Sequence, residues 1–219
     1  MNADIKDTIL QSALDKFMQF GIRNISIEKL VIHLNISTKT VYKHFKNKEE
    51  LLEEVLHLYY KKQYQLFEKL IGDQSTVTMF YDIWYNAVER EFEVNNAFFR
   101  DLHYYYSELE RKVEVEIANK FWVKLQLLIV NGISEGSFKE NINPEVLLEG
   151  ITTLSVNIGR SEQFKKFKVS HHEIFHNTIE NYIRGFCTVK GLIELDAHLE
   201  KRFSQKITTY KHLSKTSMH

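Results

Sequence analysis

The sequence predicts an all-α protein, and three observations support this fold class. The 219 residues contain only eight glycines and one proline, Pro144, so few residues interrupt helices. The long runs between them are rich in Leu, Ile, Glu and Lys, a composition that favours helices over strands. Apolar residues within these runs recur with the 3.6-residue period of an amphipathic helix. At 43% hydrophobic residues, the chain has enough apolar content to bury a substantial core in one or two domains.

The first predicted helix begins near residue 5. Its apolar positions follow the helical period: Ile5, Ile9, Leu10, Ala13, Leu14, Phe17 and Met18. Gly21 follows, where a glycine commonly ends a helix because it adopts the left-handed conformation without steric cost. We therefore expect one helix ending just before Gly21.

Two short helices joined by a tight turn are predicted next. Ser26 can cap a helix of about two turns whose apolar residues are Ile27, Leu30, Val31 and Leu34. In the turn, Asn35 tolerates the left-handed conformation, Ile36 can point inward, and Ser37 can cap the following helix. We expect that helix to run from Thr38 to Phe45, with Val41, Tyr42 and Phe45 facing inward.

The rest of the chain divides into longer helices. Asn47 and Glu50 resemble a capping box that starts a helix continuing through Tyr59. Asn143 and Pro144 form another strong helix start. Further helices are predicted at about 75–94, 96–106, 108–132, 144–164, 171–190 and 192–210, with breaks at 72–73, 95–96, 132–143 and 159–170.

Positive charge gathers in the segment that holds the turn. The whole chain has 29 basic and 29 acidic residues, which gives a formal net charge of zero. Residues 35–48 nevertheless carry four lysines (Lys39, Lys43, Lys46 and Lys48) and no acid, so this segment is +4 and the remainder is −4. A local basic surface on a neutral chain indicates a small DNA contact rather than general binding of polyanions.

The spacing of the two short helices is that of a helix-turn-helix, in which the first helix braces the second for entry into the major groove. The chain resembles the TetR family of transcriptional regulators over residues 5–55, including Thr40-Val41-Tyr42-Lys43-His44-Phe45 and Lys48-Glu49-x-Leu51. Two residues depart from the family pattern. Asn35 and Lys39 stand where that family often has glycine, which affects the details of operator recognition.

This resemblance implies a helix-turn-helix DNA-binding domain at 1–48 and an effector-binding and dimerisation domain at 49–219. It also implies that Thr38, Lys39, Thr40 and Lys43 meet bases or adjacent phosphates, and that Tyr42, His44 and Lys48 hold phosphates. Ser26 is interpreted as a helix cap, with a phosphate contact as the alternative. Ordinary solvated side chains are the alternative for the whole set.

The middle of the chain has more aromatic residues than a plain helical bundle requires. In the resembled family this region encloses a pocket for a small-molecule effector. The candidate ligand-binding residues are Tyr60, Tyr64, Phe67, Phe80, Trp84, Phe99, His103 and Trp122, each of which could instead be core. Because the sequence shows no obvious buried charge cluster, we expect an uncharged or weakly polar, hydrophobic effector.

The helices at 144–164 and 171–190 resemble the dimerisation pair of that family. Their apolar stripes are Leu147, Leu148, Ile151, Leu154 and Ile158 in the first, and Ile174, Ile179, Tyr182, Ile183 and Phe186 in the second. A homodimer would present two recognition helices to a pseudo-palindromic operator in double-stranded DNA. We therefore expect a repressor that is released when its effector favours another conformation.

A zinc hydrolase is the strongest competing hypothesis. Residues 172–176 read His-Glu-Ile-Phe-His, a motif that on a helix places His172 and His176 on one face to bind zinc, with Glu173 as the general base. A catalytic site needs a third ligand, for which Glu180 and Glu194 are candidates only by position. A helical interaction protein without DNA binding is the other alternative, and the +4 segment argues against it.

Other functional classes find no support in the sequence. It shows no glycine-rich phosphate loop, acyl-transfer triad or paired carboxylates, so we expect no catalytic residues, no metal and no cofactor. The acidic residues near Met1 and the lack of a long apolar run predict a cytosolic protein without a signal peptide or a membrane span. Cys187, the one cysteine, is expected to be a small buried hydrophobe.

Overall fold

The periodic segments fold into helices close to their predicted bounds. The computed structural model describes residues 2–160 and 162–216, so Met1, Ser161 and residues 217–219 lie outside the described part of the two predicted domains. Its helices, numbered in chain order, are α1 (Asn2–Phe20), α2 (Ile27–Leu34), α3 (Thr38–Tyr42), α4 (Lys48–Leu70), α5 (Thr76–Glu93), α6 (Asn96–Tyr105), α7 (Ser107–Ser134), α8 (Pro144–Arg160), α9 (Glu162–Lys165), α10 (His171–Phe175), a π-helical turn η1 (His176–Glu180), α11 (Asn181–Phe186) and α12 (Val189–Thr216). The predicted all-α class is confirmed.

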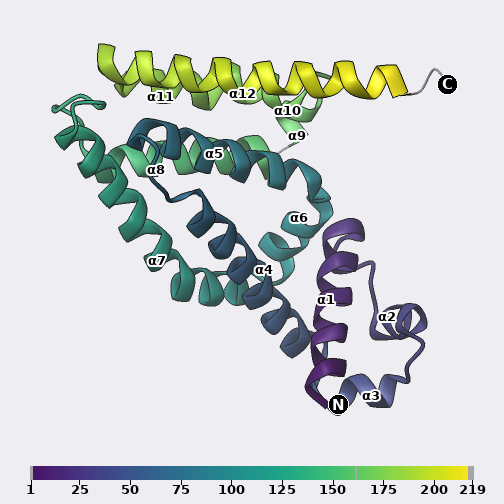
Figure 1. The fold of residues 1–219 in the computed structure, drawn as a ribbon. Helices are drawn as coiled ribbons and strands as arrows, with labels where there is room; N and C mark the ends of the chain where they lie inside the picture. Colours follow the sequence, from purple (N-terminus) through teal and green to yellow (C-terminus); the bar gives the residue numbers. More distant parts are fainter. Residues whose placement is uncertain (1, 161, 217–219) are drawn as a thin grey trace.

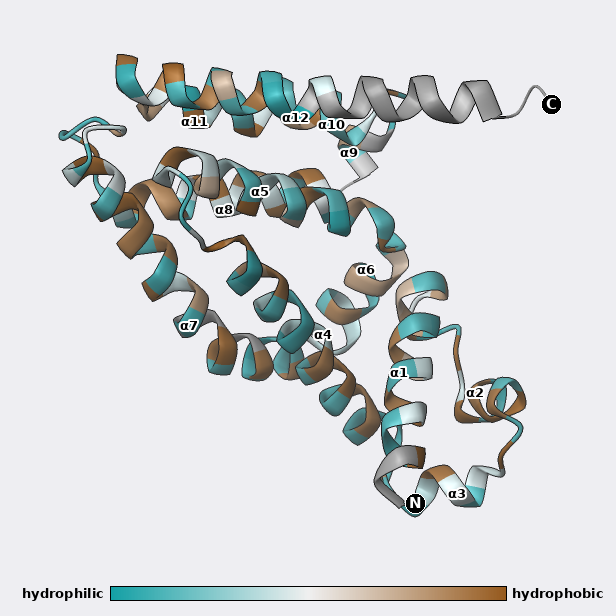
Figure 2. Ribbon diagram, viewed as in Figure 1, coloured by the Kyte–Doolittle hydropathy of each residue, from teal (hydrophilic) through white to brown (hydrophobic). Residues whose placement is uncertain are grey.

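The helices form a small head and a larger body (Figure 1). The head consists of α1, α2 and α3 and lies at one end of the molecule, while α12 crosses the opposite end. Helices α4, α6 and α7 extend between the head and the layer formed by α5 and α8. Figure 2 shows that hydrophobic and hydrophilic residues alternate along the helices, as expected for amphipathic helices that cover a shared interior.

The predicted helix caps of the head are confirmed. The Lys29 backbone N–H donates to Ser26 Oγ at 3.3 Å, and the Thr40 N–H donates to Ser37 Oγ at 3.1 Å. Asn47 caps α4 by accepting from the Glu50 N–H at 2.8 Å. Asn35 adopts the left-handed conformation with a φ of 52°, which turns the chain between α2 and α3.

Helix α3 is shorter than predicted. It ends at Tyr42 rather than Phe45, because the backbone N–H groups of His44 and Phe45 both turn back to the Val41 carbonyl, at 2.9 and 3.0 Å. Val41 and Phe45 are buried as expected. The prediction that Tyr42 faces inward is wrong, since 51% of this residue is exposed.

The predicted breaks at 132–143 and 159–170 are found, but they begin slightly later than predicted, after Ser134 and after Arg160, because the glycines that suggested their starts pack inside helices. Gly132 lies within α7, where an added Cβ would come within 2.2 Å of the Phe138 ring. Gly159 lies within α8, where a Cβ would come within 2.2 Å of the Glu91 carboxylate. Each glycine allows close approach of a neighbouring side chain and does not end its helix.

The predicted helix at 171–190 also ends early. The three contiguous helical turns α10, η1 and α11 stop at Phe186, and α12 starts at Val189. Cys187 between them forms an isolated antiparallel bridge with Phe138. It is buried as predicted, and burial raises the pKa of its thiol to about 12, which keeps it protonated and unreactive near neutral pH.

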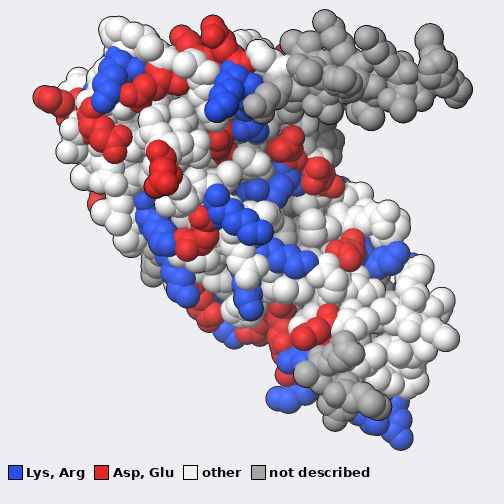
Figure 3. All heavy atoms as spheres, viewed as in Figure 1, with Lys and Arg blue, Asp and Glu red and all other residues white. Residues whose placement is uncertain are grey.

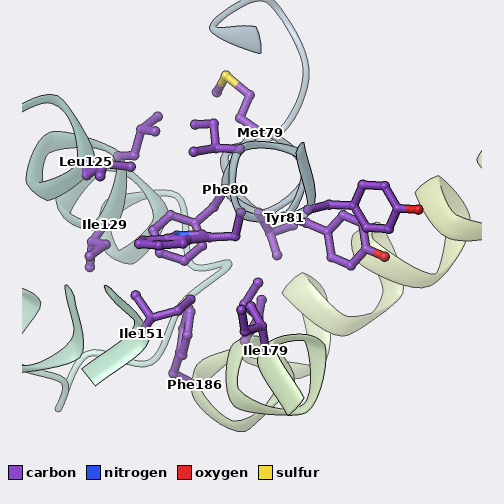
Figure 4. Close-up of a cluster of buried hydrophobic side chains, with 14 of the residues drawn as sticks. Met79, Phe80, Tyr81, Leu125, Ile129, Ile151, Ile179 and Phe186 are labelled. Carbon is purple, nitrogen blue, oxygen red and sulfur yellow. The ribbon is translucent and has the colours of Figure 1, made fainter. Parts of the chain in front are cut away.

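Two hydrophobic clusters fill the interior. The body cluster centres on Phe80 and gathers side chains from α5, α7, α8, η1 and α11 (Figure 4). The head cluster joins α1, α2 and α3 to the first half of α4, to α6 and to the start of α7. Leu51, Leu52 and Val55 are fully buried in this second cluster, so the hydrophobic packing of the head continues beyond residue 48. In the described part of the chain, no helix is long and apolar enough to cross a membrane.

The apolar stripes assigned to dimerisation mostly face the chain's own core. Leu147, Leu148, Ile151 and Ile158 of α8 are buried within the protomer, as are Ile174, Ile179, Ile183 and Phe186 of the following helices. Of the two stripes, Leu154 is half-buried and Tyr182 is exposed. Any dimer through these helices must therefore use other side chains, such as the exposed Val146.

Candidate functional site

The outer face of α3 is polar and carries positive charge. Lys39 and Lys43 are exposed on it, while Thr38 and Thr40 are half-buried. The Thr40 hydroxyl lies 2.9 Å from Ser37 Oγ, so the turn and the first turn of α3 are held together. Figure 3 shows Lys and Arg side chains at the end of the head where α3 lies. A helix braced in this way and exposed on its polar side has the form of a DNA recognition helix.

The remaining predicted DNA-contact residues surround α3. Tyr42 is exposed next to Lys43, and His44 is half-buried against Phe45. Ser26 caps α2 as predicted. Lys48 turns back into the head, where its Nζ donates to the Ile22 carbonyl at 2.6 Å and lies over the Phe17 ring. Burial accordingly lowers the pKa of Lys48.

Backbone hydrogen bonds attach the head to α6. Asp101 of α6 accepts from the Arg23 N–H at 2.8 Å, and the Asn95 N–H donates to the Met18 carbonyl at 2.9 Å. Gly21 sits against Ala97 so closely that an added Cβ would come within 2.8 Å of the Ala97 side chain, and its φ of +83° also favours glycine. The orientation of the head therefore depends on where α6 lies.

A cavity of about 250 Å³ lies in the body between α4, α5, α7 and α8. Aromatic and aliphatic side chains form most of its wall. They come from α4 (Tyr59, Tyr60, Phe67, Leu70), α5 (Ile83, Trp84, Ala87), α7 (Ile117, Phe121, Trp122, Leu125) and α8 (Val156). An enclosed apolar cavity with a few polar groups is the usual form of a small-molecule site.

A buried charge cluster lies in the same wall, contrary to the sequence analysis. Arg160 Nε of α8 donates to Glu91 Oε1 of α5 at 3.3 Å, and its guanidinium also lies 3.5 Å from Glu110 of α7. Arg90 lines the cavity beside them. Burial raises the pKa of the Glu91 carboxyl, and the two arginines oppose that rise. The basis for expecting an uncharged effector was therefore wrong.

The charge cluster also touches α6. The Arg160 guanidinium lies over the Phe99 ring at 4.5 Å. Phe99 is two residues from Asp101, which holds the Arg23 backbone of the head. A continuous set of contacts therefore joins the charged end of the cavity to the base of the head.

Comparison with known proteins agrees with this arrangement of head and body. Residues 9–55 match the model of the family described as bacterial regulatory proteins, tetR family. The chain is 23% identical over 150 residues to the HTH-type transcriptional repressor KstR2 of Mycolicibacterium smegmatis, covering 66% of this chain and 73% of that protein. It is 35% identical over 65 residues to the HTH-type transcriptional regulator YhgD of Bacillus subtilis, covering 30% of this chain and 34% of that protein. The fold is similar to that of reduced NemR from E. coli, with a TM-score of 0.71 and 15% identity over 84% of this chain and 97% of that one.

The chain carries the DNA-binding domain of TetR-family transcriptional regulators. The helix-turn-helix within the matched residues spans α2 and α3, and the described body is helical, with a cavity between α4, α5, α7 and α8. The assignment is to a regulator and not to an enzyme.

Half of the predicted ligand-binding residues line the cavity. Tyr60, Phe67, Trp84 and Trp122 do so. The other four lie elsewhere: Phe80 is in the body core against Phe138, Tyr64 packs behind the wall against Phe121, Phe99 lies under Arg160, and His103 is exposed beside Tyr104.

Polar residues of the cavity were not predicted from the sequence. They include Arg90, Glu91, Ser155 and Arg160. Arg90 and Glu91 belong to the run Glu89-Arg90-Glu91, which resembles a solvated helix face. A helical projection would have shown that Ile83, Ala87 and Arg90 share a face, since positions four and seven residues apart are neighbours on a helix.

The His-Glu-x-x-His motif does not form a metal site in the described residues. The His172 ring packs at 6.1 Å from the Tyr85 ring, whereas His176 Nδ1 lies 3.0 Å from the Glu180 carboxylate. Glu194 bonds Ser137 at 3.0 Å. Among the described residues, no group of three or more His, Cys, Asp or Glu is arranged to hold a metal ion.

Proposed function

We propose that this chain is a ligand-released repressor that binds a pseudo-palindromic operator as a homodimer. One observation supports the proposal: the head that carries the exposed, lysine-bearing α3 is bonded to α6 through Arg23, and α6 touches the charged end of a cavity. These are the parts that a repressor with a releasing ligand requires.

Operator binding is assigned to the outer face of α3. We propose that Lys39, Lys43, Thr38 and Thr40 contact bases or adjacent phosphates, and that Tyr42 and His44 contact phosphates. Phosphate contacts set the position of the head and base contacts set the sequence preference. Lys48 uses one of its three N–H donors on the Ile22 carbonyl, and we propose that another contacts a phosphate.

Release is assigned to the path through Arg160 and Phe99. A small molecule that displaces or redirects Arg160 would shift α6 and with it the orientation of the head. Two heads of a dimer would then no longer match successive major grooves. The ligand must bind the released conformation more tightly than the operator-bound one.

Selection of bound sequences from a random DNA pool tests the operator proposal. We expect the wild-type chain to enrich an inverted repeat whose half-sites are about one helical turn apart, roughly 10 base pairs centre to centre. Enrichment of an asymmetric single site would contradict the dimer, and no enrichment at physiological salt would contradict sequence-specific binding. The mass of the complex gives an independent count of the 26.0 kDa chains on each duplex.

A further inference from the structure

Four buried polar atoms on α5 lack hydrogen-bond partners among the described residues, and three of the four belong to residues that line the cavity. These three atoms are Trp84 Nε1, Arg90 Nε and Glu91 Oε2. Trp84 is only 6% exposed. Buried polar groups in folded proteins nearly always have a hydrogen-bond partner, because leaving one unpaired is costly. Three such atoms in one wall indicate that the partner is a molecule in the cavity.

The helical period explains why these atoms share one wall. Successive residues of α5 are about 100° apart around the helix axis, so Arg90, Ile83, Ala87, Glu91 and Trp84 fall in this order within an arc of about 120°. Ala87 lies at the centre of this arc, and its small side chain leaves room in front of the helix. The polar groups therefore border an open space that this small residue creates.

The cavity is polar at one end and apolar at the other. Tyr59 and Ile117 belong to the head cluster, whereas Phe67, Ile83 and Leu125 belong to the body cluster, so the cavity spans the junction between the two. Tyr59 interacts electrostatically with Glu91, Arg160 and Arg90, which places all three charged groups at the head-side end. The body-side end is aromatic and aliphatic.

Of the two arginines at the polar end, Arg160 has ion pairs within 4 Å and Arg90 has none with a described residue. Arg160 is engaged by both Glu91 and Glu110. Of the acids next to Arg90 in sequence, Glu89 lies 3.2 Å from His171, and Glu93 is exposed. Arg90 Nε is buried without a hydrogen-bond partner among the described residues, so this N–H can donate to an anion in the cavity.

We infer that the cavity binds an amphipathic carboxylate, whose acidic head accepts a hydrogen bond from Arg90 and whose apolar body lies along Phe67, Ile83 and Leu125. The inference deepens the proposed function because it names the ligand class of the proposed effector cavity. It concerns binding alone, so it is tested without DNA and can fail while operator binding stands.

A charge series tests the inference on the wild-type chain. The two tryptophans of the chain, Trp84 and Trp122, both line the cavity, so intrinsic fluorescence reports its occupancy. We expect octanoate to bind at least about tenfold more tightly than its neutral isostere octanamide, since a charge-assisted hydrogen bond is roughly twice as strong as a neutral one. Octylammonium should bind most weakly.

The variant Arg90→Met then tests whether Arg90 causes the preference for octanoate, because methionine keeps an unbranched apolar side chain and lacks the charge. This variant should bind octanoate and octanamide with equal affinity. Arg111→Met, which removes an exposed arginine of α7, should keep the wild-type preference. Equal binding of octanoate and octanamide by the wild type would overturn the inference, as would an unchanged preference in Arg90→Met. If no member of the series changes the fluorescence, the cavity holds only water and the inference also fails.

Discussion

The double variant Lys39→Ala/Lys43→Ala is expected to lose operator affinity by roughly two orders of magnitude, since each base contact contributes about 1–3 kcal/mol. Both side chains are exposed on the outer face of α3, so their removal leaves the core intact. If they touch phosphates, the slope of log K against log salt should also fall by about one unit for each lysine. Fluorescence anisotropy of a labelled operator at several salt concentrations measures both quantities.

A matched control distinguishes the effect of direct DNA contact on operator affinity from the effect of the net charge of the protein. Lys61→Ala/Lys120→Ala also removes two exposed lysines, from α4 and α7, away from the recognition helix. We expect it to bind the operator nearly as well as the wild type. Equal losses in both double variants would mean that only overall charge matters. Unchanged binding by Lys39→Ala/Lys43→Ala would remove α3 from the DNA interface.

Arg160→Met is expected to destabilise the fold by about 3–5 kcal/mol, the usual cost of leaving a buried charge without its partner. The substitution removes the cation that pairs with both Glu91 and Glu110. It also removes the contact of the guanidinium with the Phe99 ring. The melting temperature should fall by roughly 2–4 °C for each kcal/mol in a chain of this size. Lys112→Met is the control: it breaks an exposed pair with Glu53, and such pairs contribute about 0–1 kcal/mol.

The loss in Arg160→Met should grow with pH. Burial already raises the pKa of Glu91 in the wild type, where Arg160 opposes the rise. Without Arg160 the pKa of this carboxyl rises further above its unfolded value, so folding takes up a proton. Stability is then retained below the unfolded pKa and is lost as the pH climbs through the folded pKa. Denaturation at pH 5 and pH 8 should show the larger deficit at pH 8, and an equal deficit would contradict the assignment to Glu91.

Local signals in the sequence were sufficient to predict the head. Ser26, Ser37 and Asn47 cap their helices through side-chain bonds that reach only three residues ahead, so their geometry depends on nearby sequence alone. The left-handed Asn35 is local in the same way. The prediction for Tyr42 was wrong because α3 ends one turn earlier than predicted. It ends there because the N–H groups of His44 and Phe45 both donate to the Val41 carbonyl.

The body depended on contacts between distant segments, which periodicity alone does not show. Gly132 and Gly159 looked like helix ends because their close neighbours, Phe138 and Glu91, are visible only in three dimensions. The apolar stripe of α8 fitted a dimer face and an internal core equally well. The charge cluster joins residues 50 to 69 positions apart, Arg160 with Glu110 and Glu91, so no sequence window contained it.

The proposed regulation requires that the cavity and the recognition helix are coupled, and filling the cavity with a side chain tests this coupling. Ala87→Phe places a ring at the centre of the cavity wall and stands in for a bound ligand. Ala197→Phe, at an exposed site on α12, is the control. Melting curves confirm that each variant is folded, and the emission of Trp84 and Trp122 reports whether the cavity is filled.

The decisive measurement is the affinity of Ala87→Phe for the selected operator. We predict a loss of about 5- to 150-fold, the range that coupling between two sites usually spans, while Ala197→Phe binds as the wild type does. The coupling would be contradicted if the Ala87→Phe protein is folded, its cavity is filled, and it still binds the operator with wild-type affinity.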